Sequence, residues 1–265
     1  STTLKIMTGY ISPSSGNVYF NDQNIHDNTS EIQKDIGYLP ELNPLYGEMR
    51  VHDYLKFISE IRGIPKENFK SAFQKVVEEC ALNSVAHRTI GNCSKGYKQR
   101  IGLACAMIHN PKILILDEPV TGLDPNQIVE IRNLIKTLGK EKLVLMSSHI
   151  LQEIEATVDR IIIIDHGNIV ADGTTKKLMN QFMGNIKLTL EVVGFTDTKI
   201  EKFKELFNKA KIKKTKDSHK VIIEYKKKDD PRLNVFTFMV KNKLSLLEMN
   251  PQTANLEDIF RKLTN

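Results

Sequence analysis

One stretch, KILILDEP at residues 112–119, restricts the fold more than any other part of the sequence. Its apolar run has the length of a β-strand and no polar alternation, which is typical of a parallel strand buried on both faces. Asp117 and Glu118 end the run. Acids at the carboxyl end of such a strand lie at the sheet edge where α/β folds bind ligands, although two solvated acids can also simply end a strand.

The segments that follow alternate between helices and strands. Residues 125–140 predict an amphipathic helix, 143–148 (LVLMSS) a second buried strand, 150–157 a helix and 160–165 a third strand, with HGN as a hairpin turn after it. Such alternation predicts an α/β fold with a mostly parallel sheet. Upstream, residues 51 to about 109 follow a helical pattern.

The last part of the chain has a different composition. Residues 1–184 hold 20 Lys and Arg against 21 Asp and Glu, whereas residues 185–265 hold 18 against 11. The C-terminal part also reads as strand, helix, strand, helix, strand and helix, which is enough for a small α+β domain. We therefore expect a domain boundary near Gly184.

Composition also excludes several classes of protein. No apolar run reaches the 18 residues that predict a transmembrane helix, and no basic-then-apolar signal peptide opens the sequence. Three cysteines without CxxC spacing argue against a disulfide framework or a zinc site and suit a reducing compartment. The net charge of +7 in residues 185–265 leaves nucleic-acid binding open, but its lysines alternate with acids, as on an ordinary solvated surface.

Three further stretches carry polar groups suited to an anionic ligand. Ser94 and Gly96, in NCSKGYKQR, precede a predicted helix, and a helix N-terminus attracts anions. TGLDP follows the two acids directly and contains Asp124. His149 follows LVLMSS, so it is expected at the same sheet edge as Asp117 and Glu118.

In this order and spacing, these stretches resemble the nucleotide-binding domain of ABC-type ATPases, which are P-loop NTPases. CSKGYKQR resembles the family signature, ILILDEP the Walker B strand with its glutamate, TGLDP the D-loop and SSH the H-loop. GYLPELNPLYGEMRVHDYL resembles the Q-loop that leads into a helical subdomain, here at about 50–110. The resemblance implies an ABC ATPase domain over residues 1–184 and an accessory α+β domain over 185–265.

The resemblance also gives a meaning to STTLKIM, the first seven residues. In this family the Walker A loop ends in G-K-[ST]-T before an apolar helix, so Ser1 matches the Mg²⁺-binding hydroxyl and Thr2 the next, phosphate-contacting residue. The sequence then starts inside Walker A, without the Gly-rich cradle and its lysine. We expect the chain as written to fold poorly and not to hydrolyse ATP.

The family implies a role for each matched residue. ATP and Mg²⁺ would be the cofactors, with Glu118 and His149 catalytic and Asp117 on the metal. Glu41 stands where the family has the Q-loop glutamine, and a carboxylate there can also approach Mg²⁺. Contacts to the nucleotide would come from the remaining matched positions: Ser1, Thr2, Ser94, Gly96 and Asp124.

The resemblance further implies partners. Two such subunits, identical or different, would sandwich ATP head to tail, and a membrane permease would hold them at the cytoplasmic face of the membrane. The sequence resembles the ATP-binding subunits of ABC-2-type exporters. Among these, it resembles the subunits associated with gliding motility. The alternative is a soluble ABC-type ATPase that acts on nucleic acid or ribosomes.

Overall fold

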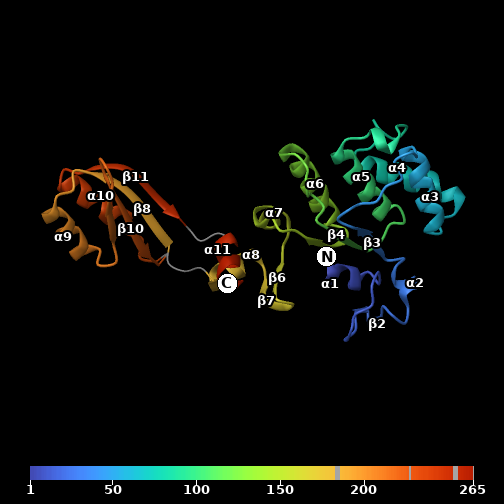
Figure 1. Ribbon diagram of the computed structural model, residues 1–265, viewed down its shortest axis with the longest axis horizontal. Helices are drawn as coiled ribbons and strands as arrows, with labels where there is room; N and C mark the ends of the chain where they lie inside the picture. The colour runs from blue at the N-terminus through green and yellow to red at the C-terminus, as the bar shows by residue number, and fades with distance from the viewer. Residues whose placement is uncertain (183–185, 227, 253–255, 265) are drawn as a thin grey trace. The chain divides into compact units, whose positions relative to one another are not determined.

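A computed structural model describes residues 1–182, 186–226, 228–252 and 256–264 of the chain. These residues divide into two compact units, Ser1–Val158 and Asp159–Asn265, and each is described by itself (Figure 1). The boundary expected near Gly184 lies outside the described residues. None of the described helices combines the length and apolar character that a membrane span requires.

The centre of the first unit is a parallel sheet in the order β3 (Ile36–Leu39), β4 (Ile113–Asp117), β5 (Leu143–Ser147). The predicted parallel pairing is therefore confirmed. Leu114, Ile115 and Leu116 of the central strand are fully buried. The expectation of a buried strand at 143–148 is only half met, because β5 lies at the edge of this sheet and Leu143 is exposed.

The helices that follow β3 pack on this sheet and on one another. They are α3 (Val51–Ile61), α4 (Lys66–Glu79), the 3-10 turn η1 (Ile90–Asn92), α5 (Lys95–Met107), α6 (Pro125–Leu138) and α7 (Leu151–Thr157). One buried core joins α3, α4, α5 and α6 to the sheet. α5 runs very close to β3, since a Cβ on Gly37 would lie 2.1 Å from the Ala106 carbonyl oxygen.

The N-terminal segment packs a smaller core against β3 and β4. It contains α1 (Thr2–Met7), the short pair β1 (Tyr19–Phe20) and β2 (Gln23–Asn24), and α2 (Thr29–Ile32). Leu4 of α1 is buried with Ile25, Ile32, Ile36 and Ile115. The packing places the start of α1, and hence Ser1, beside the carboxyl end of β4.

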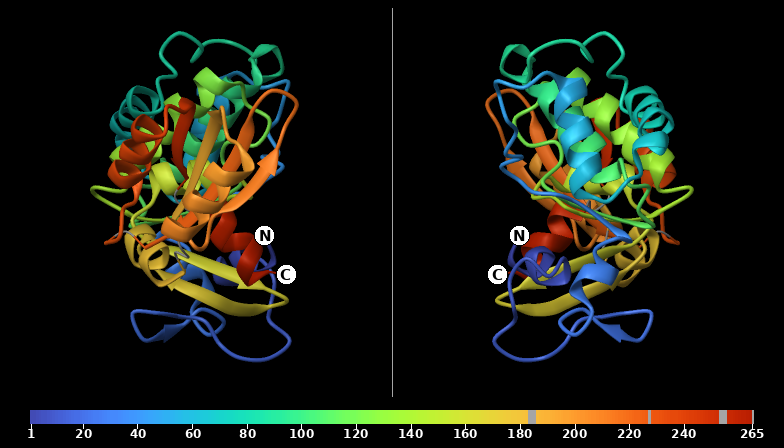
Figure 2. Two further views of the ribbon diagram at one scale, coloured as in Figure 1. Left: turned by 90° about the vertical axis from the view of Figure 1, so that its left-hand side faces the viewer. Right: turned by 90° about the vertical axis from the view of Figure 1, so that its right-hand side faces the viewer.

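The second unit begins with a hairpin, β6 (Ile161–Asp165) and β7 (Asn168–Gly173), which turns at the predicted HGN (Figure 2). α8 (Thr175–Phe182) contacts β7, and α11 (Leu256–Leu263) contacts α8. Leu178, Leu256 and Ile259 are buried there. These contacts explain why the compact unit begins at Asp159, well before the shift in charge.

Between α8 and α11 the chain forms a four-stranded antiparallel sheet in the order β11-β8-β10-β9. Its elements follow the split βαβ pattern β-α-β-β-α-β. Alternate residues of β8 and β10 pack with both helices in one core, so α9 and α10 cover the same face. The elements are β8 (Ile186–Val193), α9 (Asp197–Leu206), β9 (Lys211–Lys214), β10 (His219–Tyr225), α10 (Arg232–Lys241) and β11 (Ser245–Gln252).

Candidate functional site

Asp117 is the centre of a polar cluster at the carboxyl ends of β4 and β5. Its side chain is 1% exposed. Its Oδ1 accepts a 2.7 Å hydrogen bond from the Ser147 hydroxyl and a 3.2 Å hydrogen bond from the Ser1 hydroxyl. β4 supplies the acid, β5 and the start of α1 supply the hydroxyls, and the sheet register sets Asp117 opposite Ser147.

The second carboxylate oxygen of Asp117 shows how a cation fits here. Oδ2 is buried and has no hydrogen-bond partner among the described residues, and leaving such an atom unpaired costs free energy. The described residues contain no cluster of three His, Cys, Asp or Glu that would hold a metal alone. One carboxylate, one hydroxyl and substrate phosphates suit Mg²⁺, which usually keeps only one or two carboxylate ligands.

Glu118 turns into the same cluster by an uncommon backbone conformation. Its φ is +52°, in the left-handed region that residues with a Cβ rarely occupy. The Ser147 hydroxyl accepts a 3.0 Å hydrogen bond from the Glu118 N–H. The side-chain Oε2 then accepts hydrogen bonds from the Thr121 hydroxyl at 2.9 Å and from His149 Nδ1 at 2.8 Å. This backbone conformation is strained for a residue with a Cβ, and residues strained in this way are common at functional sites.

His149 is the exposed partner in this pair. Its side chain is 67% exposed, whereas that of Glu118 is 15% exposed. The hydrogen bond to Glu118, with the negative charge of that carboxylate, raises the pKa of His149 above its ordinary value of 6.5. A protonated His149 at this position presents a positive charge toward any anionic ligand at the sheet edge.

The structure thus brings four predicted residues together: Ser1, Asp117, Glu118 and His149. Thr2 is exposed at the start of α1, and Glu41 is exposed just beyond β3. Glu41 is near enough for its charge to contribute to the raised pKa of His149. Neither residue is held against Asp117 by a hydrogen bond in the described part of the chain.

Three residues of the site were not predicted from the sequence. Ser147 and Thr121 orient the two acids, and the buried hydroxyl of Tyr38, on β3, has no hydrogen-bond partner among the described residues. Burial, followed by the charge of Asp117, raises the pKa of Tyr38. For Ser147, the only available signal was its place at the end of a predicted neighbouring strand.

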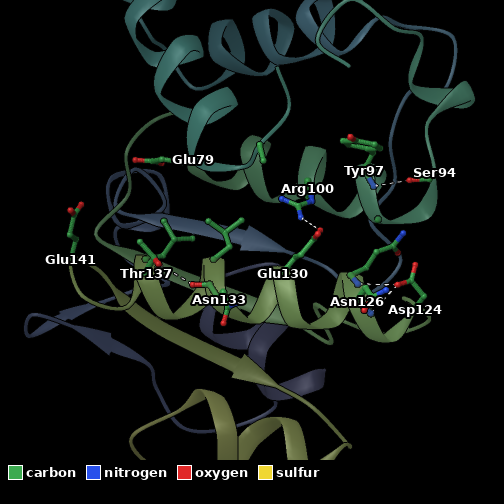
Figure 3. Close-up of a pocket in the computed structure, with 15 residues that line it drawn as sticks. Glu79, Ser94, Tyr97, Arg100, Asp124, Asn126, Glu130, Asn133, Thr137 and Glu141 are labelled. Atoms are coloured by element: carbon green, nitrogen blue, oxygen red, sulfur yellow. Dashed lines mark hydrogen bonds and ion pairs between the residues drawn. The ribbon is translucent and has the colours of Figure 1, made fainter. Parts of the chain in front are cut away.

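The other predicted residues, Ser94, Gly96 and Asp124, line a separate groove of about 920 Å³ between α5 and α6. Ser94 begins α5, where its hydroxyl accepts from the Tyr97 N–H, and Asp124 begins α6 by accepting from the Asn126 and Gln127 N–H groups (Figure 3). Arg100 pairs with Glu130 across the groove.

Two glycines let CSKGYKQR approach TGLDP and the first turn of α6. A Cβ on Gly96 would lie 2.6 Å from the Gln127 side chain, and one on Gly122 would lie 1.9 Å from Lys95 Nζ. Lys95, from the segment that resembles the family signature, therefore lies over Gly122 of the D-loop-like segment. This part of the protein presents Ser94 and Asp124, both exposed, on one surface.

A buried Asp and an adjacent Glu at the end of a parallel strand, with a His from the next strand, define a nucleotide-binding domain of the P-loop NTPase class with ABC-type organisation. Comparison with known proteins supports this directly: the family model "ABC transporter" matches residues 1–121. Together with relatives that are at least 30% identical over nearly the whole chain, this match shows that the chain belongs to the ATP-binding proteins of ABC transporters.

Relatives match over nearly the whole chain. An uncharacterized ABC transporter ATP-binding protein, YxlF of Bacillus subtilis, is 30% identical over 100% of this chain and 86% of its own length. The bacitracin transport ATP-binding protein BcrA of Bacillus licheniformis is 32% identical over 99% of this chain and 84% of its own. A solved ATP-binding subunit of an ABC transporter superposes with a TM-score of 0.60 at 27% identity, over 68% of this chain and 76% of its own. Domains of this family generally hydrolyse ATP, typically with Mg²⁺.

Proposed function

We propose that this protein is the ATP-binding subunit of an ABC exporter, in which hydrolysis of Mg-ATP is coupled to movement of a membrane permease. The observation that carries the proposal is the contact between His149 and Glu118, because it joins a candidate base to an imidazole that could contact a phosphate beside the buried Asp117. The exporter assignment is supported by the likeness to BcrA, a bacitracin transport protein.

Asp117 and Ser1 are the residues that would hold Mg²⁺. The buried and unpaired Oδ2 of Asp117 supports this role, and so does the Ser1 hydroxyl 3.2 Å from Oδ1. When bound, Mg²⁺ neutralises charge on the β- and γ-phosphates. Glu41 is the further candidate for the metal, since it stands on the same edge as His149.

Glu118 would orient the attacking water and accept its proton. Its left-handed backbone and its two side-chain hydrogen bonds hold the carboxylate in one place, which is what a general base requires. His149 would contact the γ-phosphate and stabilise charge that develops on it. Thr2 would contact phosphate at the other side of the site.

We propose that the ATP site is completed by a second ATP-binding subunit, identical or different. Ser94, Gly96 and Asp124 would contact the nucleotide of that second subunit. The position of these three residues supports this role. All three line the same open groove, and Asp117 and Glu118 of their own chain do not line it. The N-terminus of α5 would add backbone N–H donors for phosphate.

The permease would dock beside the Q-loop. Leu42, Tyr46, Phe57 and Ile61, from the loop after β3 and from α3, are exposed apolar side chains, and the rings of Tyr46 and Phe57 lie 5.9 Å apart. Exposed apolar clusters of this kind are typical of protein contacts. Held there, the protein would lie at the cytoplasmic face of the membrane, and the resemblance to gliding-motility exporters gives one candidate system.

Residues 1–265 contain no Gly-x₄-Gly-Lys-Ser/Thr motif, whose N–H groups and lysine cradle the phosphates. We propose that these residues alone do not hydrolyse ATP. The experiments below are made on the protein as it occurs naturally.

The test of the proposal is Asp117→Asn. Turnover of Mg-ATP is expected to fall by about 100-fold or more, because the buried oxygen that would meet the metal is replaced or made neutral. Asp35→Asn is the matched control, since Asp35 is half-exposed in a surface ion pair with Lys112. Equal turnover by the two variants would contradict the proposal.

A further inference from the structure

Tyr38 brings a buried hydroxyl to the sheet beside the candidate metal site. On β3 it pairs with Ile115 of β4, and Asp117 follows two residues later on the same face of the sheet. The ring of Tyr38 packs against the smaller core that contains Leu4 of α1 and Ile115. Tyr38 is therefore a diagonal neighbour of Asp117, on the face of the sheet that α1 covers.

Two polar atoms of these neighbours are buried without a hydrogen-bond partner in the described part of the chain. They are the Tyr38 hydroxyl and Oδ2 of Asp117, which do not bond to each other either. The other carboxylate oxygen, Oδ1, accepts hydrogen bonds from Ser147 and Ser1. Unpaired buried polar atoms cost free energy, so a group that bonds to both of them is favoured here.

The surroundings of the hydroxyl indicate what kind of group this is. Burial raises the pKa of Tyr38, and nearby Asp117, Tyr10 and Glu41 raise it further. The phenol therefore keeps its proton at neutral pH, close to two carboxylates that are both candidates for the metal. A neutral phenolic oxygen can accept a hydrogen bond from a water on a cation without adding charge.

We propose that Tyr38 is a positioning residue for Mg²⁺, and that its hydroxyl binds a water molecule carried by the cation that Asp117 holds. This inference rests on the proposed metal site at Asp117. Mg²⁺ gives up its waters reluctantly and usually keeps several of them in a protein. Groups that bond to the ligands of a metal orient those ligands and strengthen its binding.

A direct contact between Tyr38 and phosphate fits the structure less well. Thr2 and His149, which we propose as phosphate contacts, are both exposed. The Tyr38 hydroxyl is buried, as is Oδ2 of Asp117. By its burial, the hydroxyl belongs with the carboxylate that would hold the metal.

The first experiment measures binding of Mn²⁺, a spectroscopic substitute for Mg²⁺, to the natural protein in complex with the ATP analogue AMP-PNP. Protein is kept in excess so that all of the nucleotide is bound, and the electron paramagnetic resonance signal of free Mn²⁺ gives the dissociation constant. Tyr38→Phe is expected to raise this constant about tenfold, as is typical when a group that bonds to a metal ligand is lost.

Tyr54→Phe is the matched control. Tyr54 is also a buried tyrosine, but it lies on α3 and its hydroxyl donates a 3.4 Å hydrogen bond to the Pro44 carbonyl. The same loss of a phenolic oxygen at this position should leave the Mn²⁺ dissociation constant unchanged.

The second experiment separates a role toward the metal from a structural one. In the protein without metal or nucleotide, Tyr38→Phe removes a buried hydroxyl that no described residue bonds. The midpoint of urea unfolding should then stay the same or rise. A hydroxyl that served only the fold would lower this midpoint and leave Mn²⁺ binding by the folded protein unchanged.

Three outcomes would overturn the proposal. They are parental Mn²⁺ binding by Tyr38→Phe, equal weakening by Tyr38→Phe and Tyr54→Phe, and a lower metal-free urea midpoint in Tyr38→Phe. Asp117→Asn in the same Mn²⁺ assay tests the underlying site. If Asp117→Asn loses Mn²⁺ and Tyr38→Phe does not, only the role of Tyr38 fails; if Asp117→Asn binds Mn²⁺ like the parent, the proposed metal site itself fails.

Discussion

Ser147 lies directly opposite Asp117 across the β4–β5 pair and donates a 2.7 Å hydrogen bond to its Oδ1. The same hydroxyl accepts the N–H of Glu118. One small side chain on the edge strand therefore fixes both the aspartate that would meet the metal and the backbone of the candidate base. Ser147 is therefore the one described side chain that bonds to both acidic residues.

Ser147→Ala is expected to lower the free energy of unfolding by about 1–3 kcal/mol, the cost of leaving buried polar groups without a partner. Turnover of ATP should fall as well, because Asp117 and the turn at Glu118 lose their common anchor. Urea unfolding and an ATPase assay measure the two effects. Ser147→Thr keeps the hydroxyl and should recover most of both; a Thr variant as impaired as the Ala variant would contradict this role.

Glu118→Gln is expected to retain ATP binding and to lower turnover by about 10²–10⁴-fold, the range typical of a lost general base. The amide keeps the shape of the side chain but cannot accept a proton from water. Equilibrium binding and steady-state hydrolysis, measured on the same preparation, separate the two properties. Glu155→Gln, at an exposed position of α7, is the control. Near-parental turnover in Glu118→Gln would remove Glu118 from the mechanism.

The pKa of His149 is expected above 6.5, since Glu118 favours the charged imidazolium. A pKa raised by folding adds stability that is complete below pH 6.5 and is lost as the pH rises through the folded-state pKa. Titration of the His149 ring by NMR measures this directly. In Glu118→Gln the midpoint should move down toward the ordinary value. An unchanged midpoint in that variant would mean that the contact does not persist in solution.

Replacement of residues 186–252 by a short Gly-Ser linker is expected to leave ATP hydrolysis largely unchanged, because β8–β11 have their own core. The boundary near Gly184 is thereby tested. Deletion of all of 185–265 is the comparison, and it should be less stable because it also removes α11 from α8. Unfolding of the remaining chain in the linker variant would show that the split βαβ domain is not separable.

The elements that the sequence alone predicted well are those in which the pattern of buried residues depends only on residues of the same segment. The apolar run before Asp117 and Glu118 is the central strand β4, and the first strand expected in the C-terminal part is β8 (Ile186–Val193). The HGN turn joins β6 to β7 as expected. In these stretches the burial of each residue follows from the period of its own segment.

The features that were missed depend on neighbours that are distant in the sequence. β9 reads KIKK, which looks like solvated surface, yet it pairs with β10 as an edge strand, and exposed lysines protect such an edge. Leu143 begins an apolar run but is exposed, because β5 has a neighbour on one side in this sheet. The role of Ser147 depends on strand register, which the composition of one strand does not determine.

The packing of α11 on α8 has a consequence for synthesis on the ribosome. α8 ends at Phe182 and its contact helix begins at Leu256, with the whole split βαβ domain translated between them. At about 5–20 residues per second, the apolar side of α8 stays uncovered for several seconds. During that interval the nascent protein exposes an apolar surface on α8, and a chaperone could bind there during translation.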